Sequence, residues 1–154
     1  MSEYNRGKML GQKQMELLGK LRSNARAKLT SISRSTNIPI STLFDILKDL
    51  QGEVIKKSTV LIDFEKLGYN VQAQVILRVK KENKCKLRKH LECHSNINTV
   101  YKINNSWDFM IETIHRNVRE LDGFLENIDE KFGIEDKQIH YLIDEVKKEG
   151  FMMG

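Results

Sequence analysis

The chain has 154 residues, of which 40% are hydrophobic and 31% charged, and its formal net charge at pH 7 is +5. This length suits one ordinary domain or two small ones. The composition excludes disordered and membrane-embedded proteins, because no apolar run approaches the ~20 residues that span a bilayer. Residues 1–70 hold 12 Lys and Arg against 7 Asp and Glu, whereas residues 71–154 hold 14 of each group. This split predicts a basic module that binds an anion, most simply nucleic acid, and a neutral module with another task.

Three short helices are expected in the basic half. Apolar residues recur at helical spacing over residues 14–21, a second helical stretch covers residues 28–35, and Pro39 marks a turn before a third helix. One arc of the third helix is apolar and must pack inward: Leu43, Ile46, Leu47 and Leu50. Its opposite side carries Ser41, Phe44, Asp45, Lys48 and Asp49. Gly52 ends this helix, and the β-branched residues of 53–63 suit a short hairpin, so the pattern is that of a winged helix-turn-helix.

The second half alternates between strands and helices. Strands are expected over residues 71–79, 97–103, 107–115 and 137–146, and helices over residues 83–93 and 117–133. The second of these helices has Asn117 as its N-cap, Glu120 as the capping-box partner and Gly133 at its end. Its inward stripe consists of Val118, Leu121, Leu125, Ile128 and Phe132. The order β-α-β-β-α-β is that of a ferredoxin-like α/β sandwich. The tail, residues 147–154, is expected to add little.

Three stretches, by their order and spacing, carry a resemblance to a known family. They are "LTSISRSTNIPISTLFDILKDL", "LIDFEKLGYN" and "NNSWDFMIE". The chain resembles the Lrp/AsnC (feast/famine) transcription regulators, which join an N-terminal winged helix-turn-helix to a C-terminal ferredoxin-like domain that dimerises and often senses amino acids. The resemblance implies an α+β protein with a DNA-binding domain over residues 1–62, a connector over residues 63–70 and a ferredoxin-like dimerisation and effector domain over residues 71–154.

The chain departs from the family's pattern in three places. Gly11 and Gln14 stand where the family has aspartates at the start of the first helix, so a helix cap is missing. Asp45 and Ile46 replace two arginines that are common in the family's reading helix, and Asn105 replaces a glycine of the effector turn. The resemblance therefore specifies neither the DNA target nor the effector.

The resemblance implies that the third helix enters the major groove of double-stranded DNA. Ser41 and Thr42 can bond phosphates or bases, and Phe44 can lie against a thymine methyl group. Asp45 can accept from cytosine N4, and Lys48 is the side chain of this face that can grip guanine. Phosphate attraction must come mainly from basic residues outside the helix, namely Arg22, Arg26, Lys28, Arg34, Lys56 and Lys57. Because the outer face carries two aspartates, the alternative is a helix-turn-helix that has become a protein-interaction or ligand-sensing module.

The turn that contains Asn105, Ser106, Trp107 and Asp108 is the effector site that the resemblance implies. Asn105 and Ser106 supply polar groups, and Asp108 can pair with an amino group. Trp107 can wall a pocket or belong to the core. The effector is an amino acid or another small molecule, or is absent, because the glycine of the family's turn is missing.

The strongest metal candidates are Cys85, His90, Cys93 and His94. His90 and His94 are four residues apart and can share a helix face, but no second ligand pair lies at zinc-finger spacing, so we expect packing or surface residues and no metal. Cys85 and Cys93 would lie about 12 Å apart along a helix. Since a disulfide needs roughly 4.4 to 6.8 Å between Cα atoms, reduced thiols are expected.

Catalytic groupings and cofactor motifs are not evident in the sequence, so the chain is not expected to be an enzyme. The siroheme decarboxylases resemble the same two-domain family, but they favour a His-Tyr-Asn-Leu-Trp run where this chain has "NNSWDFM". They form the enzymatic alternative. The first residues lack the apolar core of a signal peptide, so we expect a cytoplasmic, nucleoid-associated protein without a membrane partner. A homodimer is expected, with tetramers or octamers as the higher assemblies.

Overall fold

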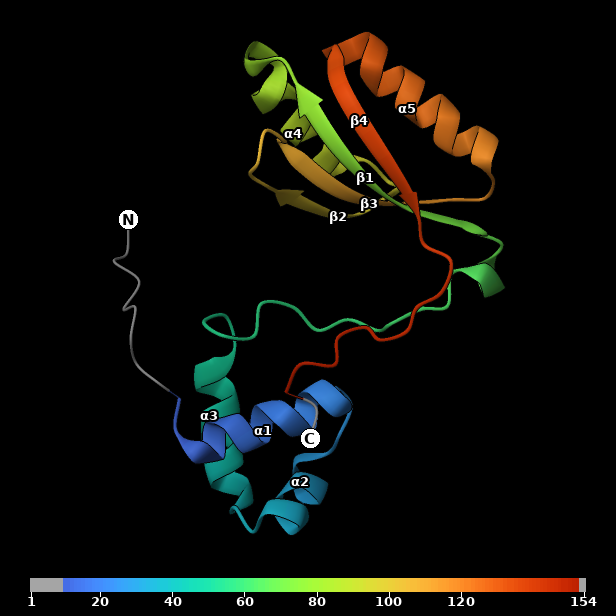
Figure 1. Cartoon of the computed structure of the whole chain (residues 1–154). Coiled ribbons are helices and arrows are strands. Elements are labelled where there is room, and N and C mark those ends of the chain that lie inside the picture. The colour runs from blue at the N-terminus through green and yellow to red at the C-terminus, as the bar shows by residue number, and fades with distance from the viewer. Residues whose placement is uncertain (1–9, 153–154) are drawn as a thin grey trace. The chain divides into compact units, whose positions relative to one another are not determined.

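The computed structural model describes residues 10–152, which form two compact units (Figure 1). The first unit holds the described residues up to Leu61 together with residues 147–152, and the second unit is Ile62–Val146. Within the described part of the chain, no helix is both long and apolar enough to cross a membrane.

The first unit is a bundle of three helices around one apolar core. The helices are α1 (Gln12–Ser23), α2 (Leu29–Thr36) and α3 (Ile40–Leu50), as the sequence predicts. The core consists of Leu17, Leu18, Ile32, Ile38, Leu43 and Leu50. Ile46 and Leu47 are partly buried and pack against this core, which confirms the inward arc predicted for α3. The opposite side of α3 is thereby turned to solvent.

Helix α1 begins with a cap that the sequence pattern did not predict. Oε1 of Gln14 accepts a hydrogen bond of 2.8 Å from the backbone N–H of Gly11, the residue directly before the helix. In a capping box, the side chain of the third helical residue accepts from the N–H of the residue before the helix, and here the carboxamide of Gln14 does so. The predicted absence of an N-cap side chain is confirmed, because Gly11 has none to offer, and the bond from Gln14 is a partial substitute that the sequence pattern did not predict.

The segment after α3 forms a tight turn and not a hairpin of strands. Gly52 has a left-handed backbone (φ +86°), and Gln51 and Ile55 form an isolated bridge. Ile55 then packs against the core of the first unit, while residues 56–63 contain no strand. The hairpin expected over residues 53–63 is therefore wrong, because the β-branched residues that follow Ile55 have no partner strand to pair with.

The C-terminal residues pack against α1. Arg22 donates through Nε to the carbonyl oxygen of Phe151 (2.7 Å), and through Nη2 to the carbonyl oxygen (3.1 Å) and Oε2 (2.9 Å) of Glu149. Met152 packs against the core of the first unit. We call these contacts of Arg22, Glu149, Phe151 and Met152 the tail clasp. The prediction that the tail adds little is wrong, because one guanidinium has enough donors to hold two carbonyls and a carboxylate at once.

The second unit is a four-stranded antiparallel sheet with two helices on one face (Figure 1). Its strands are β1 (Val71–Val79), β2 (Ile97–Lys102), β3 (Phe109–His115) and β4 (Ile134–Tyr141), in the spatial order β2-β3-β1-β4. Its helices are α4 (Lys84–Cys93) and α5 (Val118–Phe132), with short 3₁₀ helices η1 (Glu65–Leu67) and η2 (Lys81–Asn83). The βαββαβ order confirms the ferredoxin-like prediction.

The core of the second unit lies between the sheet and the helices. Every second residue of β1 is buried, from Ala73 to Val79, because successive side chains of a strand point to opposite faces. Leu87 and Leu91 of α4 complete this core together with the apolar stripe of α5. The residues of β1 between the buried ones are half-buried on the other face, opposite α4 and α5.

Two details of the second unit differ from the prediction. The sequence predicts that Val118 belongs to the inward stripe, but its side chain is 47% exposed. Val118 is the first residue of α5 and precedes the helical turn that reaches the core. Phe124 takes its place and is 7% exposed. The last strand starts at Ile134 and ends at Tyr141 instead of covering residues 137–146, because Gly133 (φ +62°) turns the chain directly from α5 into the sheet.

Candidate nucleic-acid interface and effector turn

The turn that joins α2 to α3 is fixed by local contacts. Asn37 adopts the left-handed conformation (φ +56°), which asparagine tolerates better than most residues other than glycine. The Thr36 hydroxyl donates to the carbonyl oxygen of Ile32 (2.8 Å) and accepts from the N–H of Ile38 (3.4 Å). Ile38 is itself only 4% exposed. These contacts hold α2 and α3 in the arrangement of a helix-turn-helix.

The outer face of α3 presents the residues that the sequence assigns to DNA reading. Ser41, Asp45 and Lys48 are exposed, Thr42 is half-buried, and Phe44 is 60% exposed. Ile40, which is not among the predicted reading residues, belongs to the same face and is 48% exposed. Its spacing of four residues from Phe44 could have revealed it, because residues at i and i+4 are neighbours on a helix surface. This face is therefore a short apolar strip with polar groups around it.

The basic residues assigned to phosphate contacts fall into two groups. Five are exposed and make no ion pair with a residue of the described part of the chain: Arg26, Lys28, Arg34, Lys56 and Lys57. The sixth, Arg22, is held in the tail clasp by three hydrogen bonds. The first unit thus carries several cationic side chains that are not neutralised internally.

The turn between β2 and β3 is a tight hairpin turn. Asn105 (φ +59°) and Ser106 (φ +68°) both have left-handed backbones, which is the pattern of type I′ turns. The N–H of Trp107 lies 3.4 Å from the carbonyl oxygen of Asn104 and closes the turn. Asparagine can replace the family's glycine here because its short polar side chain tolerates this conformation.

Asp108 is tied into the body of the second unit. Its carboxylate accepts from the Nζ of Lys84 (2.5 Å) and from the N–H of Val79 (2.9 Å), and its side chain is only 12% exposed. Burial alone would raise the pKa of this carboxyl group. The bonds from Lys84 and Val79, with the charges of Lys84 and Arg78, outweigh burial and hold the pKa below its ordinary value. The carboxylate is therefore already paired within the chain.

Trp107, next to this carboxylate, is also engaged within the second unit. The guanidinium carbon of Arg78 lies 5.6 Å from the centroid of the indole ring, a cation–π contact. Arg78 is itself held by Asp136 at 3.2 Å, across the pair of strands β1 and β4. Of the four residues assigned to the effector turn, Asn105 and Ser106 are therefore the two that remain exposed at its tip.

His90 of α4 and His94, the residue that follows this helix, pack against aromatic rings. The His90 ring lies 5.1 Å from that of Phe132, and the His94 ring lies 4.8 Å from that of Phe124. Burial lowers the pKa of His94, and the charges of His90 and Lys131 lower it further. Both cysteines are free and exposed, and within residues 10–152 no three metal-binding side chains of the His, Cys, Asp and Glu types are grouped to hold an ion.

A buried histidine was missed by the sequence analysis. His115, at the end of β3, is 1% exposed, and its Nε2 lies 2.6 Å from the Oγ1 of Thr113. Burial lowers the pKa of His115, while the charge of Glu120 acts in the opposite direction. Its position in the inward alternation of β3 was the signal that could have identified it.

The chain is similar to transcription regulators of Pyrococcus species. It is 31% identical over 116 residues to the HTH-type transcriptional regulator FL11 of Pyrococcus horikoshii, and the match covers 75% of this chain and 77% of the relative. FL11 of Pyrococcus furiosus is 29% identical, with the same coverage of both chains. No protein-family model matches the chain.

Solved structures share the fold over nearly the whole chain. LrpC of B. subtilis is 18% identical with a TM-score of 0.82, and the match covers 91% of this chain and 99% of that one. AsnC of E. coli is 15% identical with a TM-score of 0.80 and coverages of 92% and 97%. A regulator from Neisseria meningitidis, solved as a complex with L-Met, is 14% identical with a TM-score of 0.83 and coverages of 91% and 94%. Since FL11 is 31% identical over more than two thirds of its length and the solved structures share this fold, the chain belongs to the Lrp/AsnC family of HTH-type transcriptional regulators, which are not enzymes.

Proposed function

We propose that the chain is a sequence-specific DNA-binding regulator that reads the major groove with the outer face of α3. The observation that carries this proposal is the exposed outer face of a helix-turn-helix, in a unit whose exposed basic residues make no ion pair within residues 10–152. Residues 1–62 then act as the DNA-binding domain on the nucleoid, residues 63–70 as the connector, and residues 71–146 as the dimerisation and effector domain. The rest of the predicted second domain, from residue 147 on, belongs with the helix-turn-helix.

Attraction to phosphates comes from the flanks of the reading helix. The outer face of α3 holds Lys48 against Asp45 and Asp49, so the helix is not drawn to a polyanion by its own charge. Ser41, Thr42 and Phe44 offer short polar and apolar contacts, which suit A·T-rich sequence and DNA shape. The phosphate contacts are then made by Arg26, Lys28, Arg34, Lys56 and Lys57.

Two copies meet, in this proposal, through the face of the sheet opposite α4 and α5. Tyr101, Met110 and Ile76 are aligned across β2, β3 and β1 in this face. Ile76 and Met110 are half-buried, and Tyr101 is 54% exposed. Burying this row against a second copy removes apolar surface from water. A dimer of this kind carries two helix-turn-helix units onto a two-fold symmetric DNA site, and tetramers or octamers are the assemblies that can follow.

The regulator responds, in this proposal, to a small effector such as an amino acid. Support comes from the Neisseria regulator, which was solved as a complex with L-Met. At the turn between β2 and β3, Asn105 and Ser106 are the groups that can contact an effector, with Trp107 beside them. Asp108 is a poor partner for an effector's amino group, because its carboxylate already pairs with Lys84 and Val79.

A salt-titrated gel shift on the DNA upstream of the chain's own gene tests DNA binding. The variant Arg26→Gln/Lys56→Gln/Lys57→Gln should flatten the dependence of log affinity on log salt by about 0.9 for each phosphate that the protein no longer neutralises. The matched control, Lys86→Gln/Lys89→Gln/Lys137→Gln, removes the same charge from exposed positions of the second unit and should leave the slope unchanged.

The acidic residues of α3 favour one alternative, a helix-turn-helix that serves as a protein-interaction or ligand-sensing module. The same titration decides between the two functions. If the unmodified protein fails to bind DNA at low salt, or if both triple variants bind alike, the DNA-binding proposal is wrong and the alternative takes its place.

A further inference from the structure

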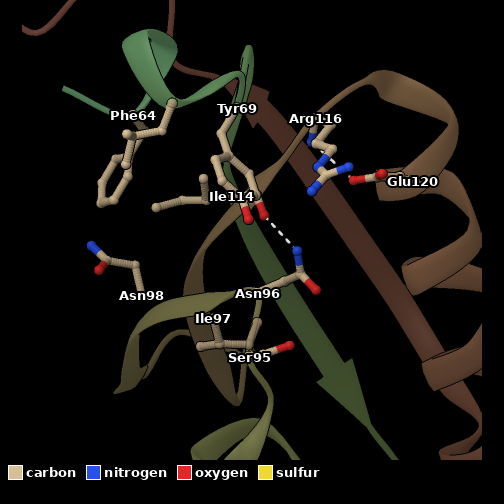
Figure 2. Close-up of a pocket in the computed structure, with 10 residues that line it drawn as sticks. Phe64, Tyr69, Ser95, Asn96, Ile97, Asn98, Ile114, Arg116 and Glu120 are labelled. Carbon is tan, nitrogen blue, oxygen red and sulfur yellow. Dashed lines mark hydrogen bonds between the residues drawn. The ribbon is translucent and has the colours of Figure 1, made fainter. Parts of the chain in front are cut away.

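A hollow of about 500 Å³ opens at one end of the sheet in the second unit (Figure 2). Its apolar lining comes from Phe64 and Leu67 of the connector and from Ile97 and Ile114 of the adjoining strands β2 and β3. Leu67 is 61% exposed, so the apolar wall is open to a molecule from solvent. Shape and lining are those of a site for a small molecule with an apolar body.

The hollow is lined by one basic side chain, Arg116, and one acidic side chain, Glu120. The guanidinium carbon of Arg116 lies 5.8 Å from the ring centroid of Tyr69, and both residues line the hollow. Among residues 10–152, no carboxylate lies within ion-pair distance of this guanidinium. A guanidinium that stacks on a ring presents its flat face to that ring. The N–H groups at its edge can still donate to the two oxygens of a carboxylate.

The polar rim around Arg116 is rigid. Glu120 accepts from the backbone N–H of Arg116 through Oε2 (2.9 Å), which fixes the start of α5 (Figure 2). The Nδ2 of Asn96 donates to the carbonyl oxygen of Ile114 (2.7 Å), and the N–H of Asn96 donates to Nδ1 of His94 (3.2 Å). Because these groups are ordered before any ligand arrives, binding loses little conformational entropy.

This hollow is separate from the turn between β2 and β3. Val71 of β1 pairs with His115 beside the hollow, whereas Leu77 pairs with Phe109 beside the turn. Six residues of a strand span about 20 Å at ~3.3 Å per residue. A ligand in the hollow would therefore not contact Asp108, and the two sites can be tested independently.

We propose that this hollow binds a small carboxylic acid with an apolar body, whose carboxylate pairs with Arg116 while its body lies on Phe64, Leu67, Ile97 and Ile114. The occupant contacts the connector directly, since Phe64, Leu67 and Tyr69 of the connector line the hollow. Binding therefore restrains the connector further and slows exchange of its amides. The inference goes beyond the proposed function, because it requires no DNA.

Calorimetric titration of the full chain with 3-phenylpropionate, its amide and L-phenylalanine tests this site. We expect saturable binding of the acid at millimolar concentration, and binding of the uncharged amide about tenfold weaker or more. L-phenylalanine shows whether an amino group beside the carboxylate is accepted. Hydrogen exchange with the acid bound should slow in residues 64–69 and stay unchanged in residues 104–108.

Variants identify the cation that holds the carboxylate. Arg116→Gln should weaken binding of the acid about tenfold or more, whereas Arg119→Gln, the matched removal of an exposed arginine on α5, should change it by less than about twofold. Leu67→Ser should also weaken binding of the acid. Because Leu67 is exposed, this variant can test the site if Arg116→Gln does not fold. The proposal is overturned if neither acid binds the unmodified chain, if the two arginine variants bind alike, or if protection appears at residues 104–108.

Discussion

Replacement of Arg22 by methionine should release the C-terminal tail from α1. Methionine keeps an apolar stem but removes all three hydrogen bonds to Glu149 and Phe151. The side chains of Arg22 and Glu149 are 36% and 58% exposed, so their ion pair contributes only about 0–1 kcal/mol. The two bonds to carbonyl oxygens contribute about 0.5–1.5 kcal/mol each. After the entropy of ordering the tail is subtracted, we expect a loss of about 1–2 kcal/mol.

Hydrogen exchange and urea unfolding measure this effect. Amides of residues 149–152 should exchange faster in Arg22→Met, and the urea midpoint of the first unit should fall. Arg26→Met is the matched control, because Arg26 is exposed and its side chain makes no hydrogen bond or ion pair within residues 10–152. Equal exchange in the two variants would refute the tail clasp. If Arg22→Met also flattened the salt dependence of DNA binding as Arg26→Met does, Arg22 would be a phosphate contact, as the sequence indicates.

Three further predictions concern the turn, acid stability and the reading helix. Ser106→Gly should raise the melting temperature of the second unit by relieving about 1 kcal/mol of strain at φ +68°, and an unchanged or lower value would contradict this. Because burial holds the pKa of His115 below 6.5, the second unit should lose stability as pH falls from about 6.5 toward that lowered pKa. The urea midpoint of His115→Gln should vary less over this pH range than that of the unmodified protein. Asp45→Arg should raise non-specific DNA affinity and steepen its salt dependence by about 0.9 in gel shifts, whereas a loss of binding would show that Asp45 itself contacts a base or a second subunit.

The elements with strong periodicity could be predicted from the sequence. The strand over Val71–Val79 and the apolar arc of α3 follow directly from spacings of two and about 3.6 residues. Asn117 marks the start of α5 because its side chain accepts from the N–H of Glu120, and Gly133 marks the end because glycine adopts a left-handed backbone easily. These features depend on neighbours within a few positions along the chain.

The contacts that the sequence did not reveal join residues far apart along the chain. Arg22 is a plausible phosphate ligand by residue type, but Glu149 and Phe151, more than a hundred residues later, occupy its donors. Asp108 looks available for an effector in the sequence because its partner Lys84 belongs to another element. Residue type indicates which chemistry a side chain can perform, but partners brought together by folding decide whether it is still available. The roles assigned to the DNA-reading and effector residues stay predictions.

The path of the chain makes the second unit an insertion within the first. The backbone leaves the helical unit after Leu61 and rejoins it at Lys147. The start of the second unit's first strand and the end of its last strand lie side by side, since Ala73 pairs with Tyr141 and the N–H of Leu142 donates to the carbonyl oxygen of Gln72. A domain whose two ends lie close together can be inserted into another domain, or removed from it, without distorting either. We therefore expect that residues 62–146 can be expressed alone, and that a protease cut within residues 56–63 leaves the two fragments associated through the tail.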